Sequence, residues 1–260
     1  MTTSLGAWLA MREAVDARSR SASLTAQLIE HLPGHRPLQA LDLATGTGSN
    51  IRYLSPRLPN PHQWRAVDCD ATLLAQVPSG VDARCAELGS LDDPTLFAGR
   101  HLVTASALLD LVSTEWLTAM VARCRELGAA VLFALSYDGR STCWPAESED
   151  DLVRELLNTH QRHNDKGFGK AAGPDAAAAA IALLGAAGYE VRHESSDWDL
   201  LPDEDAMQRE LILGWAQAAI EVDERQTRVV RNWLARRLAH VDEGRSRIRV
   251  GHQDIAAWIK

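Results

Sequence analysis

The chain has 260 residues and a formal net charge of -8, with 27 Lys and Arg against 35 Asp and Glu. This length favours one α/β domain with elaborations over two equal domains. The excess of negative charge disfavours broad electrostatic binding of nucleic acid or of an anionic membrane. No window approaches ~18 consecutive apolar residues, and the N-terminal stretch lacks a signal-peptide pattern. We therefore expect a cytoplasmic protein without a nucleic-acid or membrane partner.

The cysteines give no sign of a metal site. Cys69, Cys85, Cys124 and Cys143 show neither CxxC nor Cys/His ligand spacing. We interpret them as reduced thiols and expect neither a bound metal nor a disulfide framework.

Residues 4–32 predict two helices, because Leu24, Leu28 and Leu32 recur at helical spacing in the second. We interpret residues 1–35 as an N-terminal helical cap. The charged segment 16–20 falls between the two expected helices. It is either a solvated turn or a ligand contact, and in the second case Arg20 binds substrate.

The stretch 41–50 predicts a buried strand, a glycine-containing turn and the start of a helix. Leu41 and Leu43 belong to an apolar run, and apolar residues recur at helical spacing from Ile51 onward. Gly46 and Gly48 lack a Cβ, so a ligand can lie against the backbone and face the N–H groups of the helix start. The turn is therefore a candidate nucleotide site.

A second strand, 64–67, ends at Asp68, twenty residues after Gly48. An α/β nucleotide fold places there the carboxylate that binds ribose hydroxyls. Ile51 occupies the position where the dinucleotide fingerprint needs Gly or Ala, which argues against NAD or flavin dinucleotides. The P-loop lysine is absent, which argues against ATP hydrolysis.

These residues resemble the class I S-adenosylmethionine-dependent methyltransferases, whose first motif runs acid-x-Gly-x-Gly-x-Gly. Asp42, Gly46 and Gly48 match this motif, and Ala44 replaces its first glycine. The resemblance covers residues 36–136 and implies S-adenosylmethionine as cofactor, with Asp68 on the ribose and Glu87 near the adenine; a simple helix-start role for Glu87 stays open. The cofactor-binding residues that it implies are Asp42, Ala44, Gly46, Gly48, Asn50, Asp68, Cys69, Glu87, Leu88 and Ser106.

The remaining pattern predicts a Rossmann-like α/β fold. Strands are expected near 63–68, 81–86, 101–107 and 129–135, alternating with helices, which favours a mostly parallel sheet covered on both faces. The resemblance implies seven strands in all. We interpret residues 36–260 as the cofactor-binding domain, with helical lid insertions at about 137–173 and 200–243.

Candidate catalytic residues follow the expected strands. The candidates for the general base in methyl transfer are, in order of preference, His160, Asp110, Tyr137 and His252. His160 belongs to the polar stretch 158–169, which is either a substrate-binding loop or a solvent-exposed connection. His252 could instead be structural. The expected substrate-binding residues are Arg20, Trp144, Arg162, Lys166 and Trp198, the tryptophans stacking on a flat acceptor.

The hypothesis that follows is an S-adenosylmethionine-dependent methyltransferase acting on O or N of a small polar metabolite in a biosynthetic pathway. The Asn-Pro-Pro-aromatic signature of base methylation is absent at 107–110, which favours a small-molecule acceptor over DNA. The alternatives are an aminopropyltransferase-like or other non-methylating use of the cofactor, a dinucleotide-dependent oxidoreductase and a non-catalytic cofactor-binding subunit. A homodimer is compatible with the sequence.

Overall fold

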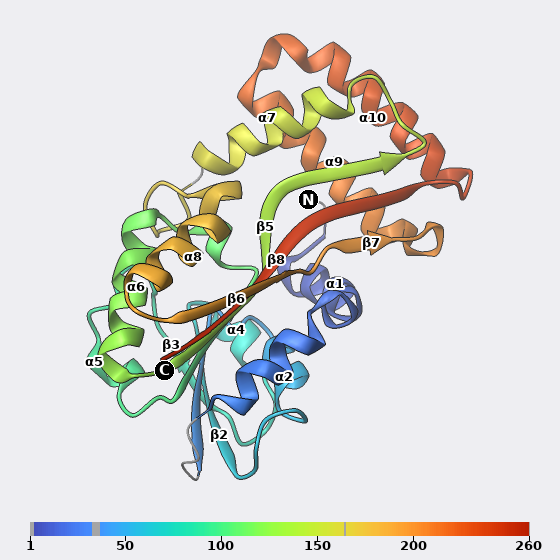
Figure 1. Ribbon diagram of the computed structural model, residues 1–260. Helices are drawn as coiled ribbons and strands as arrows, with labels where there is room; N and C mark the ends of the chain where they lie inside the picture. The colour runs from blue at the N-terminus through green and yellow to red at the C-terminus, as the bar shows by residue number, and fades with distance from the viewer. Residues whose placement is uncertain (1–2, 33–36, 164, 260) are drawn as a thin grey trace.

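The computed structural model describes residues 3–32, 37–163 and 165–259. Its centre is a sheet in the order β3-β2-β1-β4-β5-β8-β6, with the short β7 paired to β8 (Figure 1). β1 to β5 pair in parallel, and β8 runs antiparallel to both β5 and β6. The predicted Rossmann-like, mostly parallel sheet is confirmed, and β7 is an addition to it. The strands are β1 (Leu38–Leu43), β2 (His62–Asp68), β3 (Asp82–Cys85), β4 (Leu102–Ser106), β5 (Ala130–Trp144), β6 (Glu190–Ser195), β7 (Trp198–Leu200) and β8 (Arg247–Trp258).

Helices cover both faces of the sheet, as its nearly continuous apolar strands require. Side chains alternate between faces along β1: Leu41 and Leu43 belong to the core shared with α6 and α8, whereas Leu38 and Ala40 belong to the core shared with α2 and α3. The helices are α1 (Leu5–Ser19), α2 (Ala22–Glu30), α3 (Ser49–Leu54), α4 (Ala71–Leu74), α5 (Pro94–Phe97), α6 (Thr114–Leu127), α7 (Asp150–His163), α8 (Ala176–Ala186), α9 (Asp205–Val222) and α10 (Thr227–Asp242).

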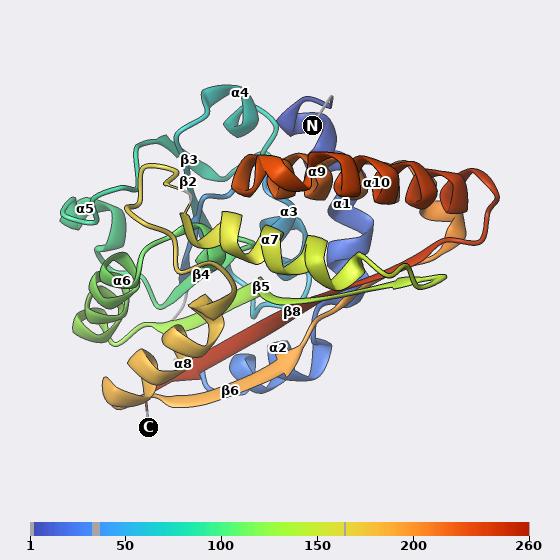
Figure 2. The same ribbon diagram turned by 90° about the horizontal axis from the view of Figure 1, so that it is seen from above.

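β5 and β8 continue beyond the sheet as a long ribbon on which α7, α9 and α10 pack (Figures 1 and 2). The two strands pair from Val131 with Ala257 to Trp144 with Arg247, with register irregularities on the way. A third core fills the space between this ribbon and the helices, and includes Tyr137, Trp198 and Trp215. Both regions that were expected to be insertions therefore contribute to one cover over the sheet's end.

Two local expectations were wrong. Segment 16–20 is not a turn between helices, because α1 extends to Ser19 and α2 begins at Ala22, directly after its N-cap Ser21. The stretch 158–169 is not wholly a loop, since α7 continues to His163. In both cases a good helix continues through charged and polar residues whose side chains face solvent or find partners.

In the part of the chain that the structure describes, no helix is long and apolar enough to cross a membrane.

Candidate functional site

The glycine turn joins β1 to α3 in an unusual backbone conformation. Gly46 and Gly48 have φ of 55° and 82°, in the left-handed region that glycine tolerates. Ala44, at the motif's replaced glycine, adopts φ 49° although its Cβ makes this region unfavourable by about 1 kcal/mol. The alanine is thus held in the conformation that the motif's glycine would adopt freely.

Asp68 at the end of β2 faces this turn. One carboxylate oxygen accepts a hydrogen bond from the Gly46 N–H at 2.8 Å, and the other accepts from the Asp70 N–H at 3.0 Å. The side chain of Leu9 on α1 lies over the turn, because a Cβ on Gly46 would come within 3.0 Å of its Cδ1. The turn is therefore bounded by the carboxylate on one side and by α1 on another.

Asp42 supports the turn from inside the protein. Its side chain is fully buried and accepts hydrogen bonds from Thr45 Oγ1 at 2.5 Å, Asn50 Nδ2 at 2.5 Å and Thr104 Oγ1 at 2.7 Å. Burial raises the pKa of Asp42, and these hydrogen bonds oppose the rise. Asp42 acts as a positioning residue, since its oxygens are enclosed by protein donors.

The other residues expected to bind the cofactor are distributed along neighbouring strand ends. Cys69 and Glu87 are exposed, just after β2 and β3. Leu88 is buried, and its carbonyl accepts a hydrogen bond from Trp116 Nε1 at 2.6 Å. Ser106 ends β4 and lines the cavity described next.

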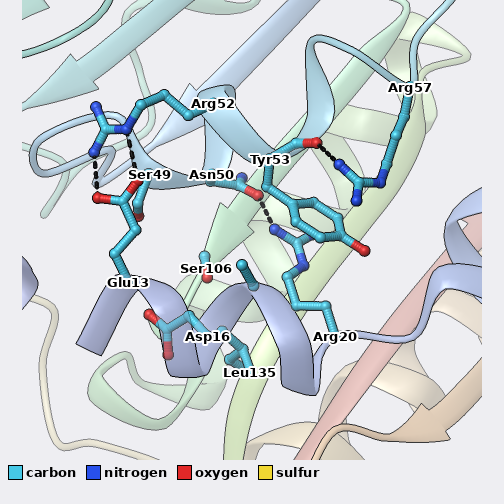
Figure 3. Close-up of a pocket in the computed structure, with 11 residues that line it drawn as sticks. Glu13, Asp16, Arg20, Ser49, Asn50, Arg52, Tyr53, Arg57, Ser106 and Leu135 are labelled. Atoms are coloured by element: carbon cyan, nitrogen blue, oxygen red, sulfur yellow. Dashed lines mark hydrogen bonds and ion pairs between the residues drawn. The ribbon is translucent and has the colours of Figure 1, made fainter. Parts of the chain in front are cut away.

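A cavity of about 250 Å³ lies beside the turn, between α1 and α3, and reaches the end of β4 and Leu135 within β5 (Figure 3). Asn50 connects the cavity to the turn, because its side-chain nitrogen donates a hydrogen bond to Asp42 and its side-chain oxygen accepts one from the Arg20 guanidinium. The lining residues are Glu13, Asp16, Ala17, Arg20, Ser49, Asn50, Arg52, Tyr53, Arg57, Ser106 and Leu135.

Three residues other than glycine have positive φ in the described chain: Ala44, Ala107 and Leu135, at 49°, 52° and 55°. Ala44 and Ala107 directly follow β1 and β4, and Leu135 lies within β5 at a register irregularity; these three strands are neighbours in the sheet. The Leu135 N–H is held by the Asp254 carboxylate at 2.8 Å. Such strained backbone concentrates at functional sites, and here it marks the edge where α/β sheets bind ligands.

A second group of side chains, which we call the polar–aromatic cluster, lies where α1 meets the ribbon. It comprises Trp8, Arg12, Asp110, Tyr137, Trp198 and His252. The Trp198 ring centroid lies 6.3 Å from that of Trp8 and 4.7 Å from that of His252, which in turn lies 6.2 Å from that of Tyr137.

Arg12 and Asp16 attach α1 to this cluster. The Arg12 guanidinium lies 4.7 Å above the Trp198 ring centroid and donates two hydrogen bonds to the Asp16 carboxylate, at 2.8 and 3.2 Å. Trp198 Nε1 also donates to Asp16, at 3.0 Å. Arg12 was not among the residues predicted from the sequence, and Asp16 was noted only within the charged segment 16–20, although Trp8, Arg12 and Asp16 recur every four residues and so share one helix face.

The titratable groups of the cluster have shifted pKa values. Burial raises the pKa of Asp110 to about 6, while backbone N–H groups and the charge of Arg12 oppose the rise. Burial, with Arg12, lowers the pKa of His252 to about 4. His252 is therefore neutral at pH 7, and Asp110 titrates close to neutrality.

Tyr137 is held in place by Asn158 on α7, whose side-chain oxygen accepts its hydroxyl hydrogen at 2.8 Å. Burial raises the pKa of Tyr137, so the phenol stays protonated. Asn158 was part of the polar stretch noted in the sequence, but its role as a partner of Tyr137 depends on a contact with no sequence signal.

The structure brings Asp110, Tyr137, His252 and Trp198 together and places Arg20 in the cavity wall. None of the four clustered residues lines the cavity, and the four remaining candidates belong neither to the cavity wall nor to the cluster. His160 contacts Glu221 of α9 at 3.1 Å, Arg162 pairs with Asp175 at 2.8 Å, and Lys166 is exposed. Trp144, 39% exposed, lies at the end of β5 beside Arg247 and Arg249.

Across residues 3–32, 37–163 and 165–259, no group of three or more His, Cys, Asp or Glu side chains could hold a metal ion.

No protein-family model and no curated protein sequence matches this chain. Solved structures do resemble it. A "putative methyltransferase" from Bacillus halodurans C-125 is 14% identical with a TM-score of 0.50, the match covering 91% of this chain and 97% of that one. The YcgJ protein from Bacillus subtilis is 12% identical with a TM-score of 0.50, over 92% and 100% of the two chains. The chain has the fold of the class I methyltransferases.

Proposed function

We propose that this protein is an S-adenosylmethionine-dependent methyltransferase that acts on an O or N atom of a small polar metabolite. The observation that carries the proposal is the arrangement along one sheet edge. A glycine turn faced by the Asp68 carboxylate lies at the ends of β1 and β2, and the buried acid Asp110 follows the adjacent β4. The first can hold a nucleoside, and the second can take a proton from an acceptor.

The residues at the turn fit this cofactor. Gly46 and Gly48 form a turn in left-handed conformations without side chains, of the kind that a nucleoside site needs, with Leu9 packed against Gly46 and with Val77 and Pro78 packed against Gly48. Asp68 would hold the ribose hydroxyls, and Glu87, exposed after the next strand, would lie toward the adenine. When bound, S-adenosylmethionine supplies an electrophilic methyl group on a positively charged sulfur.

The polar–aromatic cluster suits the preparation of an acceptor. An acceptor hydroxyl or ammonium must lose a proton, and a base with a pKa near the working pH is the most effective. Asp110, with a pKa of about 6, is mostly ionised at pH 7 and meets this condition. Neutral His252 holds its Nδ1 against the Val250 carbonyl at 3.1 Å, which leaves Nε2 as an acceptor. The surrounding aromatic rings exclude water from the reacting groups.

A thermal-shift series tests the proposal. The protein is heated alone and with S-adenosylmethionine, S-adenosylhomocysteine, NAD or ATP, since a ligand at ~100 times its Kd stabilises by ~2.7 kcal/mol. We expect stabilisation by the two adenosyl-sulfur compounds only. Pools of hydroxyl and amine metabolites are then screened for acceptor-dependent formation of S-adenosylhomocysteine. Stabilisation by NAD alone, or by no nucleoside at all, would contradict the proposal.

A further inference from the structure

Arg20 is an unusual cation in the cavity wall. Its side chain is 6% exposed, and within the described residues its guanidinium makes one hydrogen bond, from Nη1 to Asn50 Oδ1. Nε and Nη2 are buried without a hydrogen-bond partner. Buried donors without partners are costly, and such exceptions to the rule of satisfied polar groups mark a place where a ligand can supply the missing acceptor.

The carboxylates near Arg20 make their hydrogen bonds to other groups. Asp254 accepts from the backbone N–H groups of Ser21 at 3.0 Å and Leu135 at 2.8 Å, and Asp42 accepts from Thr45, Asn50 and Thr104. They offset the charge of Arg20 through space but leave its donors unused.

The remaining charges of the cavity wall leave an excess of positive charge. Glu13 is paired with Arg52 through two hydrogen bonds of 2.7 Å, and Asp16 is paired with Arg12. No described carboxylate forms an ion pair with Arg20 or Arg57. These two guanidinium groups lie 4.2 and 3.9 Å from the ring centroid of Tyr53, which supports both by cation–π contact.

We propose that this cavity is a carboxylate-binding subsite in which Arg20 is the principal cation and Arg57, with Tyr53, its support. A guanidinium donates two parallel hydrogen bonds to a carboxylate, and this geometry matches the unused donors of Arg20. At about 250 Å³ the cavity admits a carboxylate together with part of the molecule that carries it.

The carboxylate has two candidate sources if the proposed function holds. The cavity adjoins the glycine turn through Ser49 and Asn50, so the amino-acid end of the cofactor can reach it. It also reaches Ser106 at the end of β4 and Leu135 within β5, so an acidic acceptor can enter instead. The chemistry is the same in both cases, and the experiment distinguishes them.

The test compares S-adenosylhomocysteine with 5′-methylthioadenosine, which lacks the amino-acid end. Dissociation constants are measured by calorimetry for the wild type, Arg20→Gln, Arg20→Lys and the control Arg18→Gln. Arg18 lies in the last turn of α1, two residues before Arg20, but is exposed and pairs with Glu204. Succinate, with sodium chloride at equal ionic strength as reference, is added in a thermal-shift assay as a small carboxylate.

If the cofactor supplies the carboxylate, Arg20→Gln raises the Kd of S-adenosylhomocysteine at least about tenfold and leaves the Kd of 5′-methylthioadenosine unchanged. The reason is that charge-assisted hydrogen bonds are lost for the first ligand only. Arg20→Lys recovers part of the loss, and Arg18→Gln has no effect. If the acceptor supplies it, both nucleosides bind Arg20→Gln normally, and succinate stabilises the nucleoside-bound wild type but not the variant.

The subsite is overturned if Arg20→Gln binds both nucleosides and succinate as the wild type does. It is also overturned if the substitution lowers the affinity for both nucleosides by the same factor. Should Arg20→Gln fail to fold, Arg57→Gln at an exposed position replaces it, with a smaller loss expected in the same comparison. If the wild type binds neither nucleoside, the proposed function fails, and the succinate arm alone decides the subsite. The subsite is supported if succinate stabilises the wild type but not the variant, and it is overturned if succinate stabilises both proteins equally or neither of them.

Discussion

The substitution Asp110→Asn should make the protein more stable at alkaline pH while removing its proton acceptor. In the folded state burial raises the pKa of Asp110 from 3.8 to about 6. Ionising this side chain in the folded protein is therefore unfavourable relative to the unfolded chain. The stability of the wild type is unaffected by Asp110 well below pH 3.8 and is progressively lost as the pH rises through about 6.

The shift from 3.8 to about 6 corresponds to about 3 kcal/mol at pH 8. About half of that cost is already present at pH 5, because the unfolded carboxyl is ionised there. The stability difference between Asp110→Asn and wild type should thus move by about 1.4 kcal/mol in favour of the variant between pH 5 and pH 8. The asparagine oxygen can still accept from the Tyr137 N–H.

Urea unfolding of both proteins at pH 5 and pH 8 measures this change, with Asp151→Asn at a 78% exposed position as a control for surface charge. Methyl transfer by the wild type should rise with pH through about 6 and be reduced at least about a hundredfold in Asp110→Asn. A stability difference that does not depend on pH would refute the electrostatic reasoning. Full activity of the variant would remove Asp110 from the reaction.

Three further predictions concern the turn and the helical cover. Asp68→Asn should raise the Kd of S-adenosylhomocysteine, measured by calorimetry, at least about tenfold, because a ribose hydrogen bond to a charged acceptor is lost. An unchanged Kd would show that Asp68 does not bind the ribose. Ala44→Gly should raise the free energy of unfolding by no more than about 1 kcal/mol, because glycine adopts φ 49° without the steric cost of a Cβ. A clear loss of stability in urea unfolding would show that the backbone at Ala44 is not strained. His160→Ala should slow turnover without changing cofactor affinity if His160 is the base, whereas equal effects of His160→Ala and Glu221→Ala on turnover would show that only their contact between α7 and α9 matters.

The sequence predicted the fold and the glycine turn well, for local physical reasons. Apolar runs that end in glycine or aspartate specify buried strands and their carboxyl ends, and the order of such runs specifies a parallel sheet. Asp42, Gly46 and Asp68 could be placed around the turn from one short stretch and one spacing. The hydrogen bond from the Gly46 N–H to Asp68 follows from that same order of strands and turn.

The polar–aromatic cluster was only partly predictable. Asp110, Tyr137 and His252 could be proposed because each follows or lies near the end of an expected strand. Arg12 could not, since its position over Trp198 depends on how α1 packs against β7, a contact between segments almost two hundred residues apart. The long continuation of β5 was also missed, because the polar residues after Tyr137 alternate on a ribbon that lies partly in solvent.

The length of β5 and β8 has a consequence for how molecules enter and leave. Both strands pass from the middle of the sheet into the ribbon while staying paired, so the wall that carries Tyr137 and His252 cannot swing without breaking backbone hydrogen bonds. α1 is joined to its surroundings by side-chain contacts, among them the ion pairs of Glu13 with Arg52 and Arg18 with Glu204. We therefore expect the route into the site to open on the side of α1, against a wall that keeps its shape.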